Sequence, residues 1–172
     1  MKKGGGKRKG SAFERKVAGL LDKWWKVPKN TFWRTVNSGG WKQPGDITSK
    51  ISEDGTLIKF PFIVECKHYN QIDIWKVLRS NNAKIIDWWK QVTNDQEKVQ
   101  DKARLLIFRQ NNSQILVAFN DLELNKLKNQ YTTFPFVNTI RIDFYINKLP
   151  ESIHILPWDV FIQYYLKEDF YE

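Results

Sequence analysis

The segment Phe62-Ile63-Val64-Glu65-Cys66-Lys67 decides the fold, together with Pro44-Gly45-Asp46-Ile47 before it. The later segment is an apolar run of strand character that ends in a carboxylate and a lysine, and the earlier one brings a carboxylate into an apolar stretch after a Pro-Gly turn. Two carboxylates can hold a hard divalent cation, and an ammonium group beside them can contact water or a phosphate. Asp46, Glu65 and Lys67 are therefore candidates for metal-dependent phosphodiester hydrolysis. The alternative is that they are unrelated surface charges at strand ends, because so short a pattern is weak without context.

The residues between the two segments predict an antiparallel hairpin. Asp54-Gly55 lies between two apolar runs, which is a strong hairpin signal. With the turn there, Asp46 lies opposite Ile63, and alternation places Glu65 and Lys67 on the same face as Ile63. The Cα atoms of Asp46 and Glu65 are then diagonal neighbours, roughly 7 Å apart. Pro61 cannot donate to the ladder, so we expect a bulge or an unpaired position there.

The chain upstream of these segments supplies context. Ser11 is a candidate N-cap and Glu14 follows three residues later, which predicts a capping box at the start of a helix. Apolar residues recur at helical spacing over residues 13–24. A strand over residues 32–37 and a Ser-Gly loop over residues 38–40 follow. The predicted order is a helix that carries Glu14, a strand, a loop, a Gly-Asp strand, a Glu-x-Lys strand and a helix.

This order resembles the PD-(D/E)XK nuclease superfamily, and within it the archaeal-type Holliday junction resolvases and their phage relatives, over about residues 10–120. Residues 10–15 are similar to the family's G-S-x-x-E-R helix opening, and Arg34 with Ser38-Gly39 is similar to its R…S-G segment. Gly45-Asp46 matches the P-D element with glycine in the proline position, and Glu65-Cys66-Lys67 is a common form of the E-x-K element. The resemblance implies an α/β fold with a restriction-endonuclease-like core, in which a mixed central β-sheet of four or five strands, beginning with the hairpin, is flanked by helices in α-β-β-β-α-β order.

The resemblance also implies roles for individual residues. Asp46 and Glu65 would be metal ligands, along with the backbone carbonyl of Cys66. Lys67 would position the nucleophilic water, and Glu14 would be an additional acidic group at the metal site and a further candidate ligand. The implied catalytic set is thus Glu14, Asp46, Glu65 and Lys67.

Composition predicts one folded domain, since the chain has 172 residues and 15% aromatic content. We expect a flexible basic arm over residues 1–10 and a single nuclease domain over residues 11–172, with its core at about 11–120 and a family-specific part at 121–172. No stretch is apolar and long enough to span a membrane. The single cysteine suits a reducing cytoplasm, which the resemblance implies is that of a bacterial or archaeal cell or a phage-infected host. Because Cys66 alternates to the face opposite Glu65, we interpret it as a small buried hydrophobe.

The net charge of +9 is concentrated at the start of the chain. Residues 1–42 contain twelve Lys or Arg against two acidic residues, whereas residues 43–172 contain sixteen basic and seventeen acidic residues. A basic segment that leads into a carboxylate site is typical of a phosphate-backbone binder with a metal centre. The alternative for the arm is that it only aids solubility. By charge or by the resemblance, which places Arg15 and Ser38 near the scissile phosphate, the candidate DNA-binding residues are Lys7, Arg8, Lys9, Arg15, Arg34, Ser38 and Lys42.

The rest of the chain is predicted to be mainly scaffold. A helix over about residues 83–96 carries an apolar stripe that favours core packing over base stacking. Strands are expected at residues 104–108, 114–119, 139–144 and 152–155, a helix capped by Asp121 between them, and a last helix after Pro157. His68 is interpreted as a surface residue and His154 as structural. Gln91 lies where some superfamily members place a glutamine near the nucleophile, but it lacks the accompanying tyrosine and is left out of the site.

Together these observations predict a Mg²⁺-dependent DNA endonuclease, with Mn²⁺ as a substitute, that resolves four-way (Holliday) junctions by paired phosphodiester hydrolysis. Its implied reaction is in-line attack of water that leaves a 5′-phosphate. Paired cuts on opposing strands favour a homodimer. One alternative is another PD-(D/E)XK endonuclease acting on duplex, flap or nicked DNA. The other is a non-catalytic DNA-binding module, which the presence of all four catalytic candidates disfavours.

Overall fold

The computed structural model describes residues 5–35, 44–49, 58–73, 75, 76, 79, 83–99, 101–127 and 139–170. The predicted α-β-β-β-α-β order of the first six elements is confirmed. The elements in chain order are α1 (Gly5–Trp24), β1 (Phe32–Arg34), β2 (Ile47–Ser49), β3 (Phe62–Tyr69), α2 (Lys84–Gln96), β4 (Ala103–Gln110), β5 (Leu116–Phe119), α3 (Asp121–Leu127), β6 (Ile140–Ile146), β7 (Leu149–Pro157), α4 (Trp158–Tyr164) and a short 3-10 helix, η2 (Lys167–Asp169).

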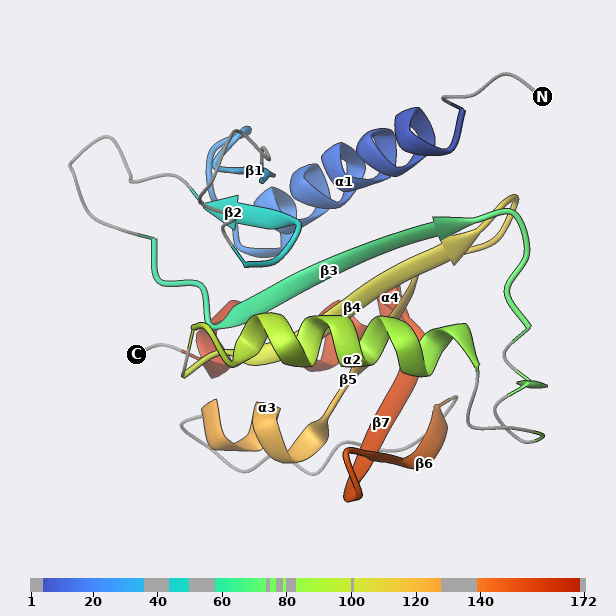
Figure 1. Ribbon diagram of the computed structural model, residues 1–172. Helices are drawn as coiled ribbons and strands as arrows, with labels where there is room; N and C mark the ends of the chain where they lie inside the picture. Colours follow the sequence, from blue (N-terminus) through green and yellow to red (C-terminus); the bar gives the residue numbers. More distant parts are fainter. Residues whose placement is uncertain are drawn as a thin grey trace.

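Five strands form one mixed sheet in the order β3-β4-β5-β7-β6 (Figure 1). β3 and β4 are parallel and are connected through α2, while the other neighbours are antiparallel. The C-terminal residues therefore complete the sheet, because β7 lies between β5 and β6. The expectation of a mixed sheet flanked by helices is confirmed.

The sheet separates two apolar cores. Residues Phe62, Val64 and Cys66 of β3 pack in the core that contains the apolar face of α1, together with α4. Ile63 packs in the other core, against α2. This alternation is what a strand buried on both faces requires. The predicted stripe on α2 belongs to the second core, and its residues Ile85, Trp88, Trp89 and Val92 are all buried.

The predicted hairpin between the two sequence segments is wrong. β2 pairs with β1, with Arg34 opposite Ile47, and together they form a separate two-stranded sheet. β3 instead takes β4 as its parallel partner, because its apolar run is buried on both faces, as is typical of parallel strands. Asp46 reaches β3 through its backbone N–H, which donates to the Val64 carbonyl at 2.8 Å. The expected Asp54-Gly55 turn lies outside the described residues.

The glycine that departs from the P-D motif has a structural reason. Gly45 has a φ of +78°, which proline cannot adopt. A Cβ at this position would lie 3.0 Å from Ile63 Cγ1 and 3.1 Å from the Val64 carbonyl oxygen. Gly45 therefore lets the backbone before Asp46 approach β3 closely.

Helix α1 begins earlier than predicted. It starts at Gly5, so Ser11 lies inside the helix and is not its N-cap. Lysine and arginine are good helix formers, and residues 7–9 carry the helix into the segment expected to be a flexible arm. Residues 1–4 lie outside the described residues. The apolar face predicted for this helix is buried at Phe13, Val17, Leu21 and Trp24.

The helix after β5 is capped one residue earlier than expected. The side-chain oxygen of Asn120 accepts a hydrogen bond of 3.2 Å from the backbone N–H of Glu123, the geometry of an N-cap.

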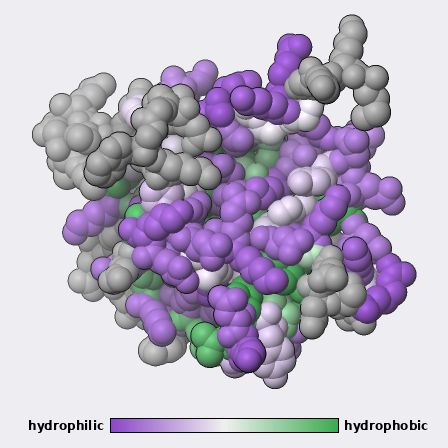
Figure 2. All heavy atoms as spheres, viewed as in Figure 1, coloured by the Kyte–Doolittle hydropathy of each residue, from purple (hydrophilic) through white to green (hydrophobic). Residues whose placement is uncertain are grey.

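Hydrophilic residues dominate the face of the molecule that carries α1 and α2 (Figure 2). None of the helices in the described part of the chain has the length and apolar character to cross a membrane.

Candidate active site

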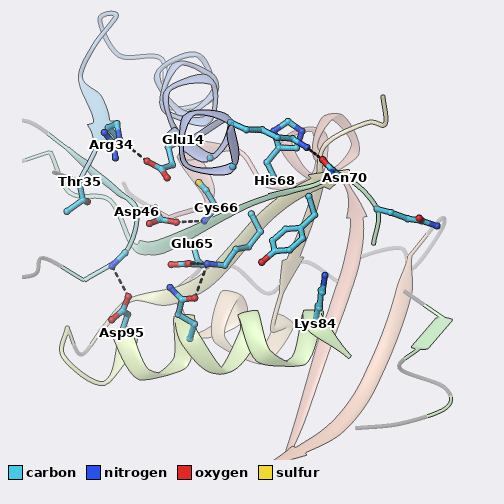
Figure 3. Close-up of a pocket in the computed structure, with 18 residues that line it drawn as sticks. Glu14, Arg34, Thr35, Asp46, Glu65, Cys66, His68, Asn70, Lys84 and Asp95 are labelled. Atoms are coloured by element: carbon cyan, nitrogen blue, oxygen red, sulfur yellow. Dashed lines mark hydrogen bonds and ion pairs between the residues drawn. The ribbon is translucent and has the colours of Figure 1, made fainter. Parts of the chain in front are cut away.

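A pocket of about 790 Å³ lies between α1, the outer edge of β3 and α2. All four residues predicted to be catalytic line it: Glu14 from α1, Asp46 from the turn before β2, and Glu65 and Lys67 from β3 (Figure 3). Their roles stay predictions, but the fold brings the four side chains, from three separate parts of the chain, into one cleft.

Asp46 is fixed between β1 and β3 by backbone and side-chain hydrogen bonds. Its carbonyl accepts from the backbone N–H of Thr35 at 2.8 Å. Its Oδ2 accepts from the backbone N–H of Cys66 at 2.9 Å. Among the described residues Oδ1 has no hydrogen-bond partner, so one carboxylate oxygen remains for a ligand.

Glu65 and Lys67 share one face of β3, as alternation predicted. The side chain of Glu65 is only 1% exposed. Lys67 Nζ donates to Glu65 Oε1 and also to Gln91 Oε1, the latter at 2.9 Å. The lysine therefore connects the buried carboxylate of β3 to α2.

The two carboxylates oppose each other's ionisation. Burial, and then the negative charge of Asp46, raise the pKa of Glu65 to about 7, although Lys67 acts in the opposite direction. Burial also raises the pKa of Asp46, while the hydrogen bond from Cys66 lowers it. Two such acids favour a bound cation, which would relieve both the burial cost and the repulsion.

The donor atoms at this site fit a hard divalent metal. Asp46, Glu65 and the Cys66 backbone carbonyl supply only oxygen, the ligand that Mg²⁺ and Mn²⁺ prefer. Within the described ranges, no group of three or more His, Cys, Asp or Glu side chains is arranged to hold a metal ion. Two carboxylates suffice for Mg²⁺, which keeps several waters and takes further ligands from substrate phosphates.

Glu14 stands at the rim of the acidic cluster. Its Oε2 accepts a hydrogen bond of 2.8 Å from Arg34 Nε, and the two side chains form an ion pair. The negative charge of Glu14 contributes to the raised pKa of Asp46. Glu14 is thus close enough to act electrostatically on Asp46, while Arg34 partly neutralises its charge.

Two residues of α2 belong to this pocket although the sequence did not assign them to it. Gln91 accepts a hydrogen bond from Lys67. The Oδ2 of Asp95 accepts a hydrogen bond of 3.2 Å from the Gly45 backbone N–H, and the charge of Asp95 raises the pKa values of Asp46 and Glu65. Their spacing of four places both on one helix face, which was the available signal.

Cys66 and His68 lie on the opposite face of β3, toward α1. Cys66 is buried in the core beside α1, as the sequence predicted, and burial raises the pKa of its thiol well above its usual range. The interpretation of His68 as a surface residue is only partly right. It is half-buried, its ring centroid lies 5.4 Å from that of Phe13, and it lines the pocket where the pocket passes around the edge of β3.

A basic groove of about 580 Å³ along α1 adjoins the pocket. None of the described residues that line it is acidic, and it shares two cations, Lys9 and Arg34, with the pocket. The predicted DNA-binding residues Ser38 and Lys42 lie outside the described residues. The other five predicted DNA-binding residues line the groove together: Lys7, Arg8, Lys9, Arg15 and Arg34.

Comparison with known proteins relates the chain to a protein family. The model of the family described as "Phage putative PDDEXK endonuclease" matches residues 5–171. No curated protein matches the chain. No solved structure matches it either.

Proposed function

This chain belongs to the phage PDDEXK endonuclease family, and we propose that it is a Mg²⁺-dependent DNA endonuclease that resolves four-way junctions. The observation that carries the proposal is the pair of carboxylates, half-buried Asp46 and buried Glu65, with Lys67 beside them, in a cleft that continues into a basic groove. Such a site can hold a cation, a phosphodiester and the flanking DNA backbone at the same time.

In the proposed reaction, Asp46, Glu65 and the Cys66 carbonyl hold the metal, with Glu14 as a further candidate ligand. When bound, Mg²⁺ supplies a Lewis acid that lowers the pKa of water and stabilises negative charge on the phosphate. Lys67 positions the attacking water through its Nζ, and its charge favours the transition state over the ground state. Attack is in line with the leaving 3′-oxygen, so the product carries a 5′-phosphate.

Gln91 and Arg34 take supporting roles in this proposal. Gln91 is a positioning residue, because it holds the ammonium of Lys67 at 2.9 Å. Arg34 pairs with Glu14 and lines both the pocket and the basic groove. Arg34 can therefore bind a phosphate entering from the groove, which would release Glu14 toward the carboxylates.

The choice of a four-way junction rests on the sequence resemblance and on symmetry. A chain with one active centre makes one cut, whereas junction resolution needs two cuts on opposing strands. A homodimer with a two-fold axis matches the near two-fold symmetry of the junction. We place this activity in the cytoplasm of the phage-infected host.

The test compares four-way, flap, nicked and linear duplex DNA of the same sequence, incubated with Mg²⁺, Mn²⁺ or EDTA. Paired cuts in the junction with either metal, and none in EDTA, are expected. Asp46→Asn serves as the inactive control, and light scattering should report about twice the 20.5 kDa chain mass. Equal cutting of linear duplex would instead establish a general endonuclease, and binding without cutting of any DNA would contradict nuclease activity.

A further inference from the structure

The pocket extends beyond its acidic residues along the edge of β3. Its four acidic residues lie at one end: Glu14, Asp46, Glu65 and Asp95. The described residues that line the other end, where β3 continues beyond Lys67, include the cations Lys9 and Lys84 and no acidic residue. Figure 3 shows Asp46 and Asp95 at one end of the pocket and Asn70 and Lys84 at the other. This second end has no part in the mechanism described above.

Lys84 lies at this end, at the first turn of α2. Its Nζ is 4.6 Å from the centroid of the Tyr69 ring, a cation–π distance. The Tyr69 ring in turn packs on Trp88, with centroids 4.8 Å apart, and Trp88 is buried. The ammonium of Lys84 is therefore held by a ring that is itself anchored in the core.

No carboxylate in the described part of the chain compensates the charge of Lys84, in contrast to Lys98, which follows the end of α2 and pairs with Asp95. A neutral ring attracts an ammonium without cancelling its charge. Lys84 thus remains available to an anion that enters the pocket.

A second cation faces the same end from α1. Lys9 Nζ donates to Asn70 Oδ1 at 2.7 Å, so an amide and not a carboxylate orients it. Cys66 donates its backbone N–H outward from β3 to Asp46, and alternation along the strand points the N–H of His68 to the same side. Two cations and a strand edge therefore flank this part of the pocket.

We propose that Lys84, held over Tyr69, binds a backbone phosphate one or two positions along the same DNA strand from the scissile phosphate. The proposal rests on the proposed nuclease function and defines the path of its substrate along β3. Tyr69 lies four residues beyond Glu65, or roughly 13 Å along a strand. At that distance Lys84 binds and orients the strand and does not contact the reacting phosphate.

The first test measures DNA binding in EDTA at several salt concentrations. Lys84→Ala should lower the slope of log K against log salt by roughly 0.9. Lys84→Arg should keep the slope. The matched control is Lys90→Ala, which removes an equal charge from the same helix outside the pocket and should leave the slope unchanged. Equal slopes for Lys84→Ala and Lys90→Ala would overturn the inference.

The second test uses substrates with one neutral methylphosphonate near the cleavage position. Wild-type cleavage should slow by about tenfold at the phosphate that Lys84 binds, as expected for one lost charge-assisted contact. Lys84→Ala should be insensitive to that position, whereas Lys90→Ala should remain sensitive. If Lys84→Ala kept the wild-type pattern at every position, Lys84 would not contact these phosphates.

Tyr69 provides a further test of how Lys84 is placed. Tyr69→Phe keeps the ring and should keep the wild-type salt slope and methylphosphonate pattern. Tyr69→Leu removes the ring and should behave as Lys84→Ala does; a wild-type result would contradict the role of the ring. A wild-type protein that binds DNA but cuts none would refute the proposed function, while the salt slopes would still decide whether Lys84 binds phosphate.

Discussion

Gln91 accepts a hydrogen bond of 2.9 Å from Lys67, the lysine that also donates to Glu65. The contact joins the face of β3 that carries the candidate catalytic groups to the helix that covers it. It fixes the direction of a long and flexible side chain, which otherwise adopts many rotamers.

Replacing Gln91 should therefore impair turnover without impairing binding. Gln91→Ala should lower kcat by roughly tenfold with little change in KM, because a poorly positioned Lys67 stabilises the transition state less well. Lys67→Ala should lower kcat further, by roughly 10²-fold or more. Steady-state cleavage assays measure both, and Gln91→Glu should restore part of the loss because it keeps an acceptor. Gln114→Ala, at an exposed position, is the control. Normal kcat in Gln91→Ala would show that Lys67 needs no support from α2.

The carboxylates should be required for cleavage but not for DNA binding. Asp46→Asn or Glu65→Gln should abolish cutting, because the metal loses a ligand, while affinity for DNA in EDTA stays the same or rises as a negative charge is removed. Gel-shift and cleavage assays on one substrate separate the two effects. The exposed Asp87→Asn on α2 should change neither. Wild-type cleavage rates in Asp46→Asn would refute its assignment.

The metal-free protein should lose stability as the pH rises. The pKa of Glu65 is raised from 4.5 to about 7 in the folded protein, so folding favours the protonated acid. The stabilisation is complete below the unfolded pKa and is lost as the pH rises toward 7. With a chelator present, the melting temperature should fall from about pH 5 to about pH 8, and the fall should be smaller in Glu65→Gln. A fall in melting temperature of equal size in both proteins would contradict the raised pKa of Glu65. At the higher pH, Mg²⁺ should restore the melting temperature of the wild-type protein.

The cations of the basic groove should bind DNA backbone independently of the carboxylates. The double variant Lys7→Ala, Arg8→Ala should weaken DNA binding and lower the salt slope by roughly 1.8, for two lost phosphate contacts. The double variant Lys16→Ala, Lys23→Ala removes the same charge from exposed positions of α1 outside the groove and is the matched control. Equal slopes in the two double variants would show that only net charge matters.

Local patterns in the sequence predicted most of what lies on single elements. Strand alternation gave the shared face of Glu65 and Lys67 and the burial of Cys66, and helical spacing gave the apolar stripe of α2. Strand pairing was not predictable in the same way, because the apolar run of β3 suits any buried partner and its actual partner, β4, follows only after α2. The predicted start of α1 was wrong because Ser11 can act as an N-cap only if the residues before it are not helical, and here the helix begins at Gly5.

The site residues that the sequence did not predict were missed for the same reason, namely that contacts between distant segments leave no local pattern. Gln91 and Asp95 enter the pocket because α2 packs on the face of β3 that carries Glu65, and packing between distant segments has no local signature. Lys84 and Tyr69 meet for the same reason. The departure at Gly45, in contrast, was visible in the sequence, but its positive φ explains it only once the backbone is seen beside Val64.

The reactivity of the single cysteine can measure how often the active site opens. Cys66 is buried beneath α1, burial raises the pKa of its thiol, and its backbone N–H donates to Asp46. A thiol reagent can modify Cys66 only while α1 or the turn that carries Asp46 has moved away from it. The labelling rate therefore reports the frequency of this local opening. Because the protein contains no other cysteine, that rate reads local fluctuation at this one position, and ligands that hold the cleft closed should slow it in proportion to their occupancy.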